Sequence, residues 1–96
     1  KYAKMAFYGQ DDHAYHEFSV DEPAEILNCT GNVSELEGEI FVHAHITLGF
    51  DNGHTAGGHL MEGTIVYACE FHGMVLGGKC LERRYDPRTG LNLWQD

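Results

Sequence analysis

The sequence predicts a small, mostly β domain built around an antiparallel sheet. Three observations support this: the clearest apolar patterns have period two, glycine-containing turn signals separate them, and no apolar stripe with 3.6-residue spacing extends beyond two turns. With 96 residues, 43% of them hydrophobic and 11% aromatic, the chain is long enough for one core and too short for two domains.

Five segments are predicted to be strands. The clearest is 40–48, where apolar side chains occupy every even position and the odd positions are mixed, which indicates a half-buried strand. Segment 64–71 is β-branched and aromatic, and segment 3–8 also has strand character, whereas 25–30 and 79–85 are weaker candidates. Turns are predicted at 30–32, 37–38, 51–53, 57–58, 77–78 and 86–90.

The charge balance disfavours two classes of partner. The chain has 15 acidic and 6 basic side chains, for a formal charge of −9, and contacts to nucleic-acid phosphates are made by Lys and Arg. No apolar run approaches the ~18 residues that a membrane helix requires.

The three cysteines suggest a compartment. Cys29, Cys69 and Cys80 form no CxxC pair, and an odd number at wide spacing is typical of free, buried thiols in a reducing cytoplasm. Cys69 alternates with apolar residues on one face of its predicted strand, which favours a core position. No basic-then-apolar leader is visible, so we expect a cytoplasmic protein.

Histidine is over-represented, since the 7 histidines outnumber Lys and Arg together. His43 and His45 are two residues apart on a predicted strand, so both side chains leave the same face. Such a pair could form half of a metal site. It is equally compatible with two polar residues on the solvated face of a strand.

The following hairpin determines whether a third histidine joins the pair. A three-residue loop, Asp51–Gly53 with Gly53 in the left-handed conformation, pairs Phe50 with His54 and brings His45 opposite His59. A two-residue loop would instead place His59 on the wrong face. The metal hypothesis therefore predicts the three-residue loop or a compensating bulge at 57–58.

The remaining candidates are weaker. By strand parity His54 faces away from His59, and His13, His16 and His72 are expected at surface or rim positions. Three histidines leave a coordination position open, and Glu62 or Glu70 could then supply an acid or base. Residues 57–58 are better explained by close backbone approach than by phosphate binding, and Arg83 and Arg84 are expected to pair with local acids or a neighbouring subunit.

Four spaced segments together resemble the prokaryotic plants-and-prokaryotes-conserved (PPC) domain: Pro23–Asn32, Phe41–His45, Ala56–Thr64 and Leu81–Asp86. The resemblance extends from about Ala3 to Trp94. It implies an α+β fold, an antiparallel sheet flanked by a helix, assembled as a homotrimer. It also implies that His43, His45 and His59 hold a metal ion, Zn²⁺ or another divalent transition metal.

Two departures from the family pattern modify these expectations. The opening strand and main helix of the family have no counterpart before Lys1, so we expect residues 1–96 to form a single domain that is N-terminally incomplete and hence mostly β. The plant members bind DNA through separate AT-hook segments, and their Arg-Gly-Arg-Pro core does not occur in this sequence. A trimer would carry three times the charge of −9, which also disfavours DNA.

Three functional hypotheses follow from the sequence. The first is a homotrimeric metal-binding domain, and the second is a DNA-binding or transcription-regulatory protein by family analogy. The third is a structural assembly module without metal. No substrate and no catalytic residue is identified from the sequence.

Overall fold

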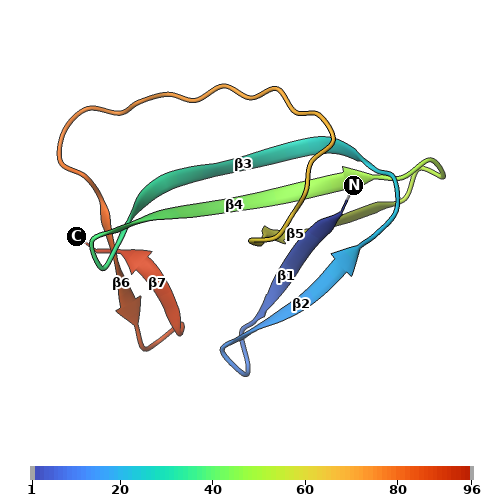
Figure 1. Cartoon of the computed structure of the whole chain (residues 1–96). Coiled ribbons are helices and arrows are strands. Elements are labelled where there is room, and N and C mark those ends of the chain that lie inside the picture. Colours follow the sequence, from blue (N-terminus) through green and yellow to red (C-terminus); the bar gives the residue numbers. More distant parts are fainter. Residues whose placement is uncertain (1, 96) are drawn as a thin grey trace.

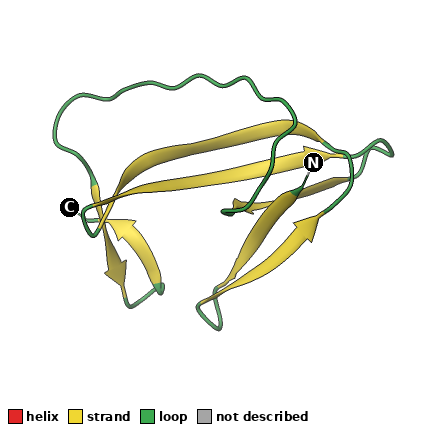
Figure 2. Cartoon of the chain, viewed as in Figure 1, coloured by secondary structure: helices red, strands yellow, loops and turns green. Residues whose placement is uncertain are grey.

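The computed structural model describes residues 2–95, which form one curved seven-stranded sheet and contain no helix (Figures 1 and 2). The order across the sheet is β2-β1-β5-β4-β3-β6-β7. The mostly β character predicted from sequence is thus confirmed. No helix in this part of the chain is suited to span a membrane. The strands are β1 (Ala3–Gly9), β2 (Ala14–Val20), β3 (Glu25–Leu36), β4 (Glu39–Gly49), β5 (Thr55–Leu60), β6 (Glu82–Asp86) and β7 (Leu91–Trp94).

The sheet is mixed rather than antiparallel, which corrects the sequence-based prediction. β3 and β6 run parallel, with Glu35 opposite Glu82 and Leu36 opposite Arg83, whereas the other strand pairs are antiparallel. Parallel neighbours need a long crossover connection. Residues 61–81 provide that connection, because they carry the chain from β5 back to the free side of β3.

The β3–β4 hairpin is the longest element of the sheet (Figure 1). Its predicted turn at 37–38 is confirmed, and Glu37 and Gly38 both have positive φ, 52° and 79°, as a tight two-residue hairpin requires. The turn predicted at 30–32 is wrong, because Gly31 lies inside β3 opposite Ala44. A Cβ atom on Gly31 would lie 2.7 Å from Ala44 Cα. The glycine therefore allows close approach of the two strands.

Gly31→Ala is expected to destabilise the domain by about 1–3 kcal/mol, because the added methyl group would collide with backbone atoms of His43 and Ala44. The urea midpoint of unfolding measures the effect. Gly73→Ala is the matched control, since a Cβ there meets no atom within 4 Å. It should change stability by less than about 0.5 kcal/mol. Equal stability of the two variants would contradict this role of Gly31.

The core is small and lies on one face of the sheet. Ala3, Met5, Ile46 and Leu48 are buried, and the partly buried Val20 and Leu60 pack against them. On the same face of β4, Ile40 and Val42 are 79% and 62% exposed. The predicted half-buried strand is therefore buried only at the end where β1 and β5 pack.

Residues 66–81, named here the strap, arch over this core face as an irregular segment, while hairpins β1–β2 and β6–β7 bend toward the other face (Figures 1 and 2). The strand predicted at 64–71 is wrong, since within it only Ile65 pairs, with Tyr2. The strand predicted at 79–85 begins only at Glu82. A strand needs an open sheet edge, and the strap crosses a face instead.

Two further predictions are corrected by the same segments. All three cysteines are free, as expected, but they are exposed rather than buried, because Cys69 and Cys80 lie in the strap and Cys29 on a partly uncovered part of β3. The turn predicted at 57–58 is also wrong. Gly58 lies within β5, where a Cβ atom would be 2.7 Å from Ala6 O, so close backbone approach explains this glycine.

Candidate metal centre

The face opposite the core forms a concave cavity of about 540 Å³, floored by β4 and β5 and flanked by the two bent hairpins. The tips of these hairpins touch, because the Tyr8 hydroxyl donates a 2.5 Å hydrogen bond to the carbonyl of Thr89. The turn after β6 is fixed by Asp86, whose carbonyl accepts from Gly90 N at 2.8 Å. The contact holds β1–β2 and β6–β7 on either side of the cavity.

The β4–β5 hairpin has the three-residue loop that the metal hypothesis predicts. Phe50 N donates to His54 O at 2.9 Å, and Gly53 has a φ of 82°. His45 is consequently paired directly with His59. The predicted register is confirmed without any bulge at 57–58.

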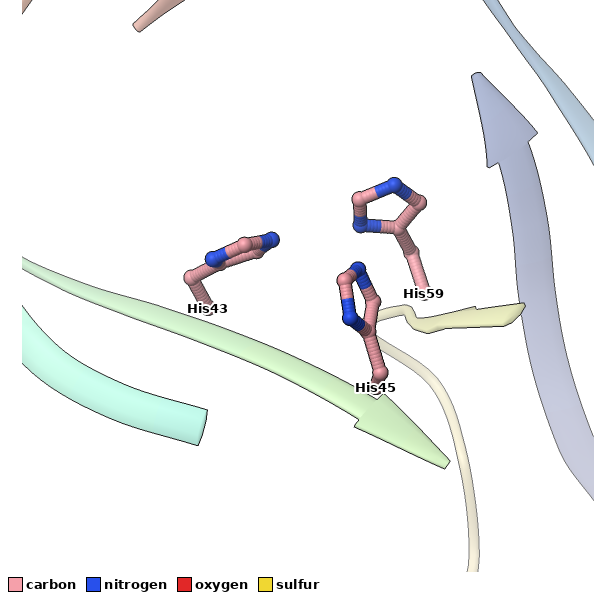
Figure 3. Close-up of side chains that lie close together, drawn as sticks. All are labelled: His43, His45 and His59. Atoms are coloured by element: carbon pink, nitrogen blue, oxygen red, sulfur yellow. The ribbon is translucent and has the colours of Figure 1, made fainter. Parts of the chain in front are cut away.

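His43, His45 and His59 converge in the cavity (Figure 3). One ligand nitrogen from each lies within 4.8 Å of the others. The ring centroids are 4.9 Å apart for His43 and His45, 4.4 Å for His45 and His59, and 5.4 Å for His43 and His59. His43 and His45 share one face because they are two residues apart on β4, and the three-residue loop brings His59 opposite His45.

The electrostatic environment keeps two of these imidazoles neutral. Burial lowers the pKa of His43 below its ordinary value of 6.5, and the positive charges of Arg83 and His45 lower it further. Burial, His45 and His43 lower the pKa of His59 in the same way. Neutral imidazole is the form that binds metal. His43 and His59 therefore need little or no proton displacement at neutral pH to bind a metal.

The donor set fits a divalent transition metal. Nitrogen ligands around a tetrahedral Zn²⁺ lie about 2.0–2.1 Å from the ion and hence about 3.4 Å from one another. The three histidine nitrogens, all within 4.8 Å of one another, are close to this arrangement. No Asp or Glu is among the described residues that line the cavity. The three imidazoles would thus leave one coordination position for a water or another ligand.

Other predicted site residues lie elsewhere. His13, His16, His54 and His72 are exposed and outside the cluster. Neither proposed carboxylate lines the histidine cavity: Glu62 is exposed, and Glu70 borders a separate cavity of about 390 Å³ between the strap and the core face.

Sequence reasoning missed two side chains of the cavity. Tyr15 contacts His59 edge-on at 5.2 Å between centroids, and its strand β2 was not predicted. Arg84 pairs with Glu82 at 3.5 Å as expected, but Arg83 is buried without an acidic partner among the described residues. Sequence offers no way to distinguish these arginines, because the burial of Arg83 depends on side chains from distant strands.

Comparison with known proteins places this arrangement in a family context. The family model described as the Plants and Prokaryotes Conserved (PCC) domain matches residues 2–77. A metal-containing protein from Archaeoglobus fulgidus has 35% identity and a TM-score of 0.78 over 99% of the chain, and a plant- and prokaryote-conserved protein from Pyrococcus horikoshii has 31% and 0.76 over 98%. A candidate DNA-binding protein from Bacteroides thetaiotaomicron shares the fold, with 23% identity and a TM-score of 0.74 over 98% of the chain.

The chain spans only part of these structures: 66% of the Archaeoglobus, 64% of the Pyrococcus and 65% of the Bacteroides protein. No curated protein sequence matches the chain significantly.

Proposed function

The chain belongs to the Plants and Prokaryotes Conserved domain family, abbreviated PCC or PPC, and from this premise we propose that it binds one divalent transition-metal ion, preferably Zn²⁺, through His43, His45 and His59. The observation that carries the proposal is the convergence of three imidazoles on one cavity. The Archaeoglobus relative named metal-containing supports it at 35% identity.

The proposed site favours a ligand-binding or catalytic role over a purely structural one. Structural zinc sites commonly close with four protein ligands, whereas sites with three protein ligands keep a position for water or substrate. A metal ion at such a position acts as a Lewis acid and lowers the pKa of bound water. The chain's own contribution is to hold the imidazoles of His43 and His59 neutral and to keep carboxylates out of the cavity.

Metal stoichiometry tests the proposal directly. Protein purified without chelator should contain about one zinc ion per chain by elemental mass spectrometry. The triple variant His43→Ala/His45→Ala/His59→Ala should contain none, although it should retain the far-ultraviolet circular dichroism of a β protein. Metal-free wild-type protein that also fails to take up added Zn²⁺, Co²⁺ or Ni²⁺ would contradict the proposal.

Zinc affinity should be nearly constant above pH 6.5 and fall as the pH drops through the lowered pKa values of His43 and His59. Protons then compete for the ligand nitrogens, so the zinc affinity should fall about tenfold per pH unit for each titrating ligand.

The stability of the metal-free domain should also decrease as the pH falls. Imidazoles of the unfolded chain take up protons first, so acidification favours unfolding. Chelator competition and urea unfolding between pH 5 and 8 measure the two effects, and a pH-independent zinc affinity would contradict them.

We also propose that the chain self-associates. The expectation of a homotrimer comes from the family resemblance. Large apolar side chains of the strap are almost fully exposed, Phe71 at 92% and Val75 at 99%, and Ile40 and Val42 add to the exposed apolar surface. Monomeric proteins seldom leave large apolar patches uncovered, so this amount of exposed apolar surface favours association with another chain. Light scattering should give three times the chain mass of 10.7 kDa. The variant Phe71→Asp/Val75→Asp should shift this mass toward that of one chain, and a wild-type monomer would contradict the proposal.

DNA binding is not expected, despite the description of the Bacteroides relative. Of the five basic side chains of residues 2–95, Arg83 is buried, Lys79 is exposed on the strap, and three form ion pairs, Lys4 with Glu17, Arg84 with Glu82 and Arg88 with Asp86. A mobility-shift assay at low salt should show no complex at micromolar protein. A complex that weakens steeply with added salt would contradict this expectation.

A further inference from the structure

Arg83 is a buried cation with no carboxylate partner among residues 2–95. It is 7% exposed, and its three hydrogen bonds go to neutral acceptors. These are Ser34 Oγ at 3.1 Å, the carbonyl of Asn92 at 3.0 Å and Asn32 Oδ1 at 3.0 Å. A guanidinium has five N–H donors. Some of them therefore remain free for another acceptor, and a buried charge is stabilised when that acceptor is an anion.

The guanidinium is held rigidly. It makes cation–π contacts with two aromatic rings, since its Cζ atom lies 5.3 Å from the centroid of Phe41 and 5.0 Å from that of Trp94. Together with the three hydrogen bonds, these contacts fix the plane and direction of the fork. A rigid fork loses little entropy when it binds a planar oxyanion.

Arg83 and the histidines line the same cavity. Phe41, His43 and His45 project from one face of β4, so the guanidinium over Phe41 lies beside His43 along the strand. Asn32, which accepts from Arg83, is the cross-strand partner of His43. A ligand in the cavity can therefore reach the guanidinium and the histidine cluster together.

The cavity is chemically unlike the rest of the molecule. The chain carries a charge of −9, yet no carboxylate is among the described residues of the cavity wall, which is largely aromatic and aliphatic. Its volume of about 540 Å³ is that of a small-molecule site. The planar fork matches a carboxylate in two-point contact, and the apolar wall suits a compact hydrophobic body.

We propose that Arg83 is the anion-binding residue of this cavity and that the cavity takes a small organic carboxylate with an apolar or aromatic body. The inference rests in part on the proposed metal function, because the metal ion would supply the second contact to the ligand. The contact with Arg83 itself belongs to the chain alone and can be tested without metal.

Benzoate is a suitable probe, and Trp94, the single tryptophan, is a built-in reporter because its ring makes a cation–π contact with Arg83. The metal-free and the zinc-loaded protein are each titrated with benzoate, and binding is followed by tryptophan fluorescence and calorimetry. We expect saturable binding to both forms, at least about tenfold tighter with zinc. Benzyl alcohol, which keeps the ring and lacks the charge, should bind about 10- to 100-fold more weakly, the usual loss for hydrogen bonds to a charged group.

Variants separate the roles of the two neighbouring arginines. Arg83→Gln should lower benzoate affinity about 10- to 100-fold, whereas Arg84→Gln should leave it unchanged, because that side chain is 70% exposed and ion-paired. Arg83 also ties β3 to β6 and β7, so its variant could lose the fold. The benzoate and benzyl alcohol titrations of the wild type keep the proposal testable in that case.

The outcomes distinguish this inference from the proposed metal function. If zinc binds but benzoate and benzyl alcohol bind equally or not at all, the carboxylate site is refuted and the metal site stands. If zinc does not bind, the metal proposal fails, and benzoate binding to the metal-free chain still supports Arg83 as an anion site. Tighter binding of inorganic phosphate than of benzoate would overturn the carboxylate assignment.

Discussion

Replacing His45 by alanine should weaken zinc binding by on the order of 100-fold or more, because even the loss of a group that only supports a metal ligand costs about 10- to 100-fold. His45 is exposed and its ring reaches both other histidines, so the substitution removes a ligand without opening the core. Competition with a chromophoric chelator measures the affinity. His59→Ala should have an effect of the same size.

His54→Ala is the matched control for this prediction. His54 belongs to the same hairpin and is also exposed, but it lies outside the cluster. Its replacement should leave zinc affinity within about twofold of wild type, since distant sites act independently. Equal losses from His45→Ala and His54→Ala, or wild-type affinity in both, would contradict the three-histidine assignment.

Zinc should also raise the melting temperature of the domain substantially. At a free zinc concentration of 100 times Kd, binding to the native state contributes about 2.7 kcal/mol, which is about 10–20 °C for a domain of this size. The buried hydrophobic cluster is small, with Ala3, Met5, Ile46 and Leu48 and two partly buried neighbours, so a contribution of this size is a large fraction of the total stability. Differential scanning fluorimetry with and without zinc measures the shift.

The same experiment separates the metal-binding domain from a purely structural assembly module. Mg²⁺ at equal concentration should produce no comparable shift, because it prefers oxygen ligands over imidazole. The triple histidine variant should not respond to zinc. A wild-type melting temperature insensitive to zinc would favour the assembly module.

The position of the candidate site could be predicted from sequence because it depends on local rules. The two-residue spacing of His43 and His45 fixes a common face, and the loop 51–53 fixes the register of the next strand. Both rules act within a single hairpin. No knowledge of the remaining strands was needed to bring His59 opposite His45.

Features that depend on distant contacts were not predictable in this way. Gly31 has the sequence environment of a turn but lies in mid-strand, because its lack of a side chain serves close packing against Ala44. Segment 64–71 has the composition of a strand, yet it joins the sheet only through the bridge between Ile65 and Tyr2 and then crosses the core face, a course that depends on contacts far along the chain. Arg83 and Arg84 look alike in sequence, and only Phe41 and Trp94 from other strands make the first of them a cavity residue.

Anomalous X-ray scattering at the zinc absorption edge tests the central claim most directly. Crystals of protein purified without chelator and supplied with one equivalent of zinc should show one strong anomalous peak per chain, within bonding distance of nitrogens from His43, His45 and His59. A peak bound by other residues, or no peak at this cluster after zinc addition, would contradict the assignment of the three histidines as a metal centre.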